Sequence, residues 1–231
     1  MKNRTFAFLL IICSQWAFSQ DAAVKAIDSL YKEDQFYAGV TYNLLGNKPS
    51  GIKQRGFSTG FYLGFIKDMP LNKNRNIAIG MGIGYATNSL NQNMLIDKGP
   101  SGNFVYTILD DTSGNYTKNK FSTNLLEFPI EFRWRTSTAT NYDFWRIYTG
   151  FKLGYLFAHS AKFKGDLGDY KYTNIKDFNN LQYGLTLSAG YSTWNFHIYY
   201  GLNSIFNNDA TLNGQTIDMN ELKIGLLFYI L

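Results

Sequence analysis

The sequence has 231 residues, a formal net charge of +5 and an aromatic content of 17%. This aromatic-rich composition, without low-complexity tracts or long charge blocks, excludes an intrinsically disordered chain. The basic residues are spread along the sequence and do not form a patch or an RNP-like motif, so we expect no nucleic acid among the partners.

The first 19 residues have the organisation of a secretory signal peptide. Lys2 and Arg4 precede the apolar run 6–13, and Ala17-Phe18-Ser19 has the small-x-small pattern of a cleavage site. Cys13, the one cysteine, lies within this segment. We therefore expect an exported mature chain that has no disulfide, no thiol chemistry and no cysteine metal site.

Residues 20–33 are predicted to be a periplasmic lead-in, either a short amphipathic helix or a loose linker. Beyond the signal peptide, no window approaches the roughly 18 consecutive apolar residues of a transmembrane helix. Residues 34–231 are predicted to form one β-domain.

That domain contains eight segments in which apolar residues alternate with glycine and polar residues. A strand crosses a bilayer with about 9–11 tilted residues, and eight is the smallest usual strand number of a bacterial outer-membrane barrel. The segments are residues 36–44, 57–65, 77–86, 126–135, 145–157, 181–191, 194–202 and 221–230.

The connectors between these segments alternate in length. The longer ones follow the first, third, fifth and seventh segments, as expected of extracellular loops, and the shorter ones are typical of periplasmic turns. The longer connectors are 46–55, 87–120, 159–177 and 203–218, and the shorter are 67–74, 136–143 and 192–193.

Three tryptophans lie at the ends of segments next to the short connectors. Trp134, Trp145 and Trp194 share the apolar face, where we expect a periplasmic aromatic girdle. The predicted fold is therefore all-β, an eight-stranded antiparallel transmembrane β-barrel with a filled lumen, in the cell outer membrane.

The segment 126–135 carries four charges on one face. Glu127, Glu131, Arg133 and Arg135 would cost several kcal/mol each in lipid, so we expect them in the lumen. There they would meet Arg146 and Lys152 of the next strand, about 5 Å away. A salt-bridged structural filler is the preferred interpretation, and a proton or ion relay is the alternative. Pro129 interrupts the same segment and predicts a bulge or bend.

The chain resembles the PorT family of outer-membrane β-barrels from Bacteroidetes. The resemblance is carried by the signal peptide, the even-strand layout and the motif Leu126-Glu127-Phe128-Pro129-Ile130. It implies a part in the type IX secretion system and in gliding motility, with other secretion components as partners. An eight-stranded barrel fills its lumen with its own side chains, so we expect an accessory or assembly component and not the conduit. The alternative is a small structural or adhesive barrel of the OmpA/OmpX kind.

The C-terminal segment is similar to the signal read by the barrel assembly machinery. Lys223, Gly225, Phe228 and Ile230 occupy the positions of its polar, glycine and apolar residues, and the chain ends on Leu231. Outer-membrane lipids and the assembly machinery are thus expected partners.

Candidate catalytic residues are few. His159 and His197 are the histidines, and Ser160 follows His159 directly. His159 lies at the height where lipid-modifying barrels use a Ser/His/Glu set. No carboxylate is evidently placed to orient the imidazole, so we expect no enzyme activity. The connector 87–120 contains Asp97, Asp110 and Asp111 without calcium-loop spacing, and we expect a solvated loop there, with no cofactor or metal.

Overall fold

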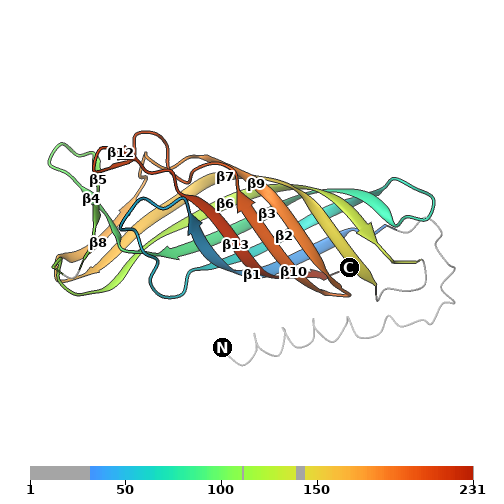
Figure 1. Cartoon of the computed structure of the whole chain (residues 1–231). Helices are drawn as coiled ribbons and strands as arrows, with labels where there is room; N and C mark the ends of the chain where they lie inside the picture. Colours follow the sequence, from blue (N-terminus) through green and yellow to red (C-terminus); the bar gives the residue numbers. More distant parts are fainter. Residues whose placement is uncertain (1–31, 111, 139–143, 231) are drawn as a thin grey trace, which may run out of the picture. The chain divides into compact units, whose positions relative to one another are not determined.

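A closed antiparallel sheet forms the body of the computed structural model, which describes residues 32–110, 112–138 and 144–230. Among these residues, eight strands pair in the order β6-β3-β2-β1-β13-β10-β9-β7, and pairing of β6 with β7 closes the barrel (Figure 1). The barrel strands are β1 (Gln35–Gly46), β2 (Thr59–Pro70), β3 (Ile77–Asn91), β6 (Tyr116–Arg135), β7 (Trp145–Gly165), β9 (Leu181–Tyr191), β10 (Trp194–Gly201) and β13 (Asn220–Ile230).

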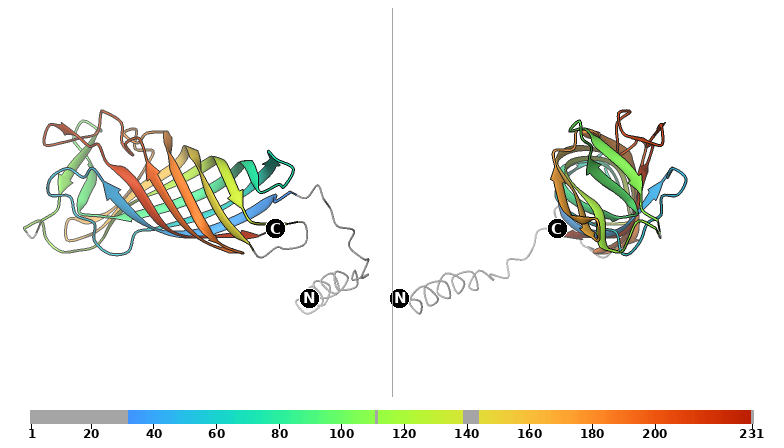
Figure 2. Two further views of the ribbon diagram at one scale, coloured as in Figure 1. Left: turned by 45° about the vertical axis from the view of Figure 1, so that its right-hand side comes forward. Right: turned by 90° about the vertical axis from the view of Figure 1, so that its left-hand side faces the viewer.

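Five short strands lie at one end of the barrel, away from the short turns (Figure 2). β4 pairs with β5 and β11 pairs with β12 in two small sheets, and β8 pairs with the outer end of β7. These strands are β4 (Met94–Lys98), β5 (Phe104–Ile108), β8 (Gly168–Thr173), β11 (Thr211–Leu212) and β12 (Gln215–Thr216).

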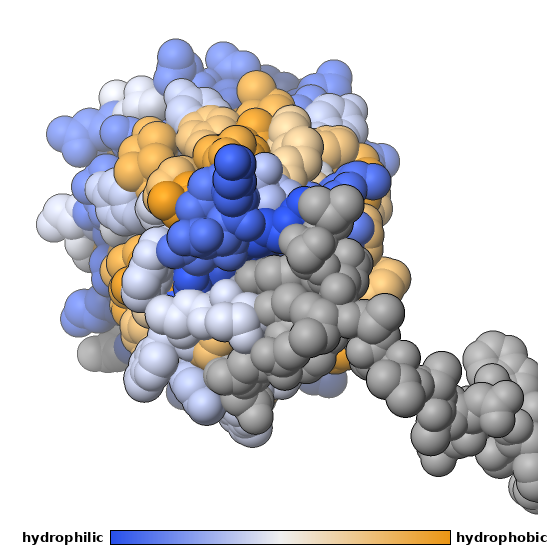
Figure 3. All heavy atoms as spheres, turned by 90° about the vertical axis from the view of Figure 1, so that its right-hand side faces the viewer, coloured by the Kyte–Doolittle hydropathy of each residue, from blue (hydrophilic) through white to orange (hydrophobic). Residues whose placement is uncertain are grey.

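Burial alternates along each barrel strand, because successive side chains point to opposite faces. In β6, Phe128, Ile130 and Phe132 are exposed on the outside, whereas Glu127 and Glu131 are buried inside. Figure 3 shows hydrophobic residues on the flanks of the barrel and hydrophilic residues around the end with the short turns. The predicted fold class is confirmed, with the apolar face outward.

The two longest predicted connectors are largely β-structure, so the expectation of a solvated loop over 87–120 is wrong. β3 continues to Asn91, β4 pairs with β5, and β6 begins at Tyr116. In the connector 159–177, β7 continues to Gly165 and pairs with β8. The added strands satisfy their backbone groups by pairing with one another above the barrel, and their loops bury apolar side chains there.

A bulge explains why the sequence pattern is lost in β7. Leu125 pairs with Leu156 and Asn124 pairs with Ala158, so Phe157 is an extra residue on β7. An inserted residue exchanges the two faces of the strand beyond it. Outward side chains are therefore odd-numbered below Phe157 and even-numbered above it.

Pro129 interrupts pairing without producing the predicted bulge. On the β7 side it pairs with Lys152 in unbroken register. On the β3 side the ladder passes from Met81–Ile130 to Gly84–Glu127 without a shift, and the pairs between them are missing. The loss of the proline N–H thus removes local pairing with one neighbour and inserts no residue.

Candidate functional site: the charged lumen

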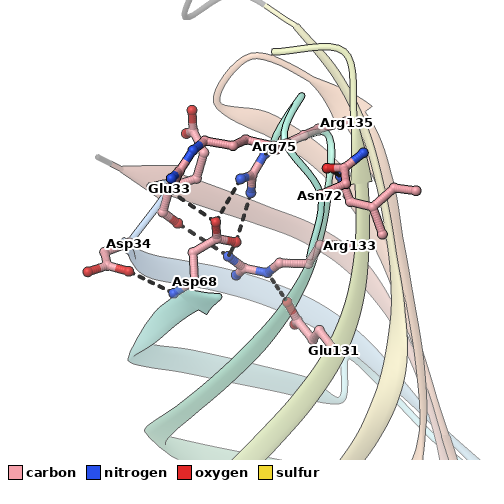
Figure 4. A network of polar contacts seen from close by, with 9 residues as sticks. Glu33, Asp34, Asp68, Asn72, Arg75, Glu131, Arg133 and Arg135 are labelled. Carbon is pink, nitrogen blue, oxygen red and sulfur yellow. Dashed lines mark hydrogen bonds and ion pairs between the residues drawn. The ribbon is translucent and has the colours of Figure 1, made fainter. Parts of the chain in front are cut away.

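The lumen near the short turns is occupied by ion pairs centred on Asp68 of β2. Its carboxylate accepts two hydrogen bonds from Arg135, each 2.7 Å, and one from Nη1 of Arg133 at 3.2 Å (Figure 4). Nε of Arg133 donates to Glu131 at 3.1 Å. The side chains of Asp68, Arg133 and Arg135 are fully buried. These charge-assisted bonds, one of them bidentate, link β2 to β6 across the intervening β3.

This cluster also holds the chain that enters β1. Nη1 of Arg133 donates to the carbonyl oxygen of Glu33 at 3.2 Å, and the Glu33 N–H donates to Asp68 at 3.3 Å. The Asp68 N–H in turn donates to the Asp34 carboxylate at 2.7 Å. The last residues of the predicted lead-in are therefore attached to the inner wall of the barrel, and most of that lead-in, like the signal peptide, lies outside the described residues.

A second layer of ion pairs lies further up the lumen. Lys152 contacts Glu127 at 3.0 Å and Lys223 contacts Glu221 at 2.7 Å. The two ammonium groups lie 4.7 Å from the ring centroids of Tyr62 and Tyr199, respectively. Because aromatic faces attract cations, these rings complete the surroundings of both lysines.

Arg146 differs from the other predicted lumen charges. Its guanidinium lies 4.4 Å from the ring centroid of Phe144 and 5.5 Å from that of Tyr229. Within the described residues, its Nε and one Nη atom have no hydrogen-bond partner. The structure thus brings Glu127, Glu131, Arg133 and Lys152 into ion pairs, and places Arg146 among aromatic rings.

The outer mouth is closed by an aromatic cap formed by Tyr106, Phe121, Phe178 and Phe206. Ring centroids of Phe178 and Phe206 are 4.6 Å apart, and Phe121 lies 5.6 Å from both. A small pocket beside Tyr199 and Glu221 has a volume of about 10 Å³. That volume is at the limit for a single water molecule.

Residues 18–207 match the family described as outer membrane protein beta-barrel domain. The chain belongs to this family. As a member, it is a protein of the outer membrane, and the closed barrel with an apolar exterior is its membrane-spanning part. The expected localisation is confirmed.

Among solved structures, the chain is similar to Ail, the attachment invasion locus protein of Yersinia pestis. The identity is 11%, over 87% of this chain and 100% of that one, with a TM-score of 0.40. Ail in complex with the heparin analogue sucrose octasulfate gives 11% identity, 86% and 99% coverage and a TM-score of 0.34. Comparison with curated proteins gives no match.

The two histidines of this outer-membrane barrel lie in different surroundings, and the one that contacts a serine hydroxyl is enclosed in the lumen. His159 stacks on Phe178 at 4.7 Å, and the adjacent Ser160 points to the opposite face of β7. His197 contacts Ser188 at 2.7 Å, but both are buried in the filled lumen. In the part of the chain that the structure describes, no group of three or more His, Cys, Asp or Glu residues is arranged to hold a metal ion, and no helix could cross a membrane.

The three tryptophans lie on the outside of the barrel at the end with the short turns, on one side of the closed sheet. Trp134 is the last residue but one of β6, Trp145 begins β7 and Trp194 begins β10, and all three are exposed. Trp145 packs against Tyr191 at 5.3 Å. Amphipathic rings at this height suit the membrane–water interface.

The four residues of the predicted assembly signal lie on β13, which joins β1 to β10. Lys223 points inward to Glu221, and Ile230 is exposed and pairs with Phe36 of β1. A Cβ at Gly225 would lie within 2.0 Å of the Val40 carbonyl oxygen, so this position requires glycine. Recognition by the assembly machinery stays a prediction.

Asp68 and Glu221 are the charged lumen residues that sequence reasoning missed. Asp68 falls in the segment 67–74, interpreted as a connector, and Glu221 was placed on the inner face without a role. The signal for Asp68 was present, because it continues the inward series Gly60, Tyr62, Gly64 and Ile66 in steps of two.

The pH dependence of stability tests the role of Glu33 in the ion-pair cluster centred on Asp68. Burial raises the pKa of the Glu33 carboxyl, although Arg135 and Arg146 oppose the shift. The unfolded chain releases this proton at a lower pH than the folded protein, so the free energy of unfolding falls as the pH rises from the ordinary pKa of glutamate through the raised pKa of Glu33. We expect Glu33→Gln to raise the thermal unfolding temperature in detergent at about pH 8, and the difference to vanish below about pH 4, where glutamate is protonated in both states.

The exposed carboxylate of Asp209 supplies the control, since Asp209→Asn is expected to have no such pH-dependent effect. A Glu33→Gln variant that is less stable than the wild type at about pH 8 would show that the carboxylate contributes as an ion pair.

Proposed function

We propose that this outer-membrane barrel is a non-enzymatic accessory or assembly component of the type IX secretion machinery. The proposal rests on the PorT-like segment Leu126-Glu127-Phe128-Pro129-Ile130, whose residues have distinct structural roles. Glu127 pairs with Lys152 inside, and Phe128 and Ile130 face lipid. Pro129 interrupts pairing with β3.

The observation that carries the accessory role is the filled lumen. A translocated polypeptide needs a continuous passage, but the described side chains occupy the interior with two ion-pair layers and the aromatic cap. Moving them aside would expose buried charges without partners, at a cost of several kcal/mol each. A role beside the conduit requires no such opening, and leaves the loops and turns available to partners.

The absence of enzyme activity is part of the proposal. Ser–His catalysis needs a hydroxyl within hydrogen-bond reach of an imidazole that substrate can also reach. His159 and Ser160 lie on opposite faces of β7, and the contact between His197 and Ser188 is enclosed in the lumen.

The test is deletion of the gene, followed by measurement of secreted proteins and of gliding. We expect both to be lost and to be restored by the wild-type gene. Normal secretion and motility in the deletion strain would contradict the proposal and leave a structural or adhesive barrel as the remaining function. Complementation with Asp209→Asn, a surface variant, controls for expression.

A further inference from the structure

Five lysines form a ladder on the outward face of the sheet where it extends above the barrel. Lys120 of β6 pairs directly with Lys162 of β7, which pairs with Lys171 of β8. One step higher, Lys118 pairs with Lys164. Cβ atoms of directly opposed residues on one face lie about 4.5–5.5 Å apart, so the side chains of Lys120, Lys162 and Lys171 start from neighbouring positions in one row.

The residues on the opposite face of the sheet show that the lysine side chains point outward. Phe121, Ala161 and Phe163 alternate with the lysines and are buried under the extension. The lysines are exposed, apart from the half-buried Lys120. They continue the outward face of β6 that carries Phe128 and Ile130 lower down.

The ladder has little negative charge of its own. Asp169 contacts Lys164 at 3.6 Å with both side chains exposed, and Lys120 donates to the Ser89 hydroxyl at 2.9 Å. Exposed ion pairs of this kind contribute little, and like charges directly opposite each other destabilise a sheet. Lysines are common on edge strands, where they prevent unwanted pairing. That explanation does not apply to Lys120 and Lys162, because their strands are paired on both sides.

The height of the ladder relates it to the membrane surface. Lys120 precedes Trp134 of the periplasmic girdle by 14 positions. With about 3.3 Å per residue and a tilt near 40°, it lies roughly 35 Å above that girdle, whereas the apolar band of such barrels is about 25 Å tall. The ladder is therefore about 10 Å above the acyl chains, at the level of lipid head groups.

The residues between the apolar band and the ladder have intermediate polarity. Tyr85 and Phe157 pack with ring centroids 6.2 Å apart, and the Tyr85 hydroxyl donates to Asn124 at 2.6 Å. Ser122 and Ser160 then pair just below Lys120 and Lys162. With increasing height on the barrel wall, the exposed groups are aromatic rings, an amide, hydroxyls and then ammonium groups. This order matches the rise in polarity from the acyl chains to the head groups of a membrane.

We propose that the lysine ladder binds the phosphate groups of a phosphorylated glycolipid in the outer leaflet, and so fixes the orientation of this side of the barrel. Phosphate oxygens between the ammonium groups would offset their mutual repulsion, and the acyl chains of the same lipid would cover Tyr85 and Phe157. Continuity with the lipid-facing surface favours a membrane lipid over a soluble anion as the occupant.

The experiment uses the full mature chain in nanodiscs of phosphatidylcholine doped with diphosphoryl lipid A, monophosphoryl lipid A or the fully dephosphorylated lipid. Retained lipid is measured by native mass spectrometry, and thermal unfolding is measured in parallel. The test variant is Lys120→Gln/Lys162→Gln/Lys171→Gln. The matched control, Lys53→Gln/Lys98→Gln/Lys176→Gln, removes the same charge from exposed positions in two loops and at the end of β4.

We expect wild-type affinity to fall in the order diphosphoryl, monophosphoryl, dephosphorylated. A lysine near an anionic surface contributes about fivefold to affinity, so the test variant should bind diphosphoryl lipid A about 100-fold more weakly, and the control close to wild type. In pure phosphatidylcholine the test variant should unfold at a higher temperature than the wild type, because the opposed charges are gone.

Three results would overturn the proposal. One is equal retention of the three lipids by the wild type, which decides the question even if the triple variant fails to fold. Another is equal weakening by the two triple variants, which would indicate a general charge effect. The third is displacement of lipid A by equimolar inorganic pyrophosphate, which would identify a site for soluble phosphates.

Discussion

Replacing Asp68 with Asn lowers the free energy of unfolding by about 3–5 kcal/mol, the expected cost of leaving a buried charge uncompensated. Arg133 and Arg135 both use this carboxylate, and both side chains are fully buried. An amide oxygen can still accept a hydrogen bond, but it carries no charge to balance two guanidinium groups. The measurement is equilibrium unfolding in urea, followed by tryptophan fluorescence and by the heat-modifiable gel shift.

The matched control is Asp169→Asn, which breaks the exposed pair with Lys164 and should change stability by less than about 1 kcal/mol. Glu131→Leu should have an intermediate effect, since Arg133 loses its 3.1 Å contact but keeps Asp68. If Asp68→Asn lowered the free energy of unfolding by no more than Asp169→Asn does, the result would mean that water reaches Arg133 and Arg135.

Replacing Phe206 with Ala should cost about 3–5 kcal/mol, the range for truncating a buried phenylalanine. The Phe206 ring touches Phe178, Phe121 and Tyr106 from three other parts of the chain, so its removal leaves a hole at the centre of the aromatic cap. The ion pairs below do not depend on this ring. We therefore expect the outer loops to become sensitive to protease in membranes, while the barrel keeps its gel shift.

The matched control is Leu167→Ala. Leu167 lies at the same end of the molecule, but it is an exposed apolar residue of the β7–β8 turn and does not belong to the aromatic cap. It should change stability by less than about 0.5 kcal/mol. If the outer loops of Phe206→Ala resisted protease as well as those of Leu167→Ala, the result would contradict the conclusion that the aromatic cap holds these loops in place.

The barrel could be predicted because lipid and lumen impose opposite polarity on alternate residues. Phe128, Glu127 and their neighbours in β6 show this directly, and so do the tryptophans at one end. Above the membrane this constraint ends. Residues such as Tyr106 and Phe206 pack against other loops, and their sequence spacing has no period that reveals the contacts.

A lumen filled with ion pairs could be predicted from the sequence, but the residues that pair with one another could not. Inward charges on β6 follow from the cost of charge in lipid, but the choice of Asp68 as the shared acceptor depends on where the neighbouring strand ends. The bulge at Phe157 also escaped detection, because an inserted residue breaks the alternation on which the strand assignment depends. The lysine ladder became visible only when the register of β6, β7 and β8 was known.

The interior described above has a consequence for membrane permeability. An ion that enters from either side meets the aromatic cap or the arginine–aspartate cluster, and finds no continuous water column through the described part of the barrel. The described part of the barrel therefore offers ions and small solutes no open path across the membrane.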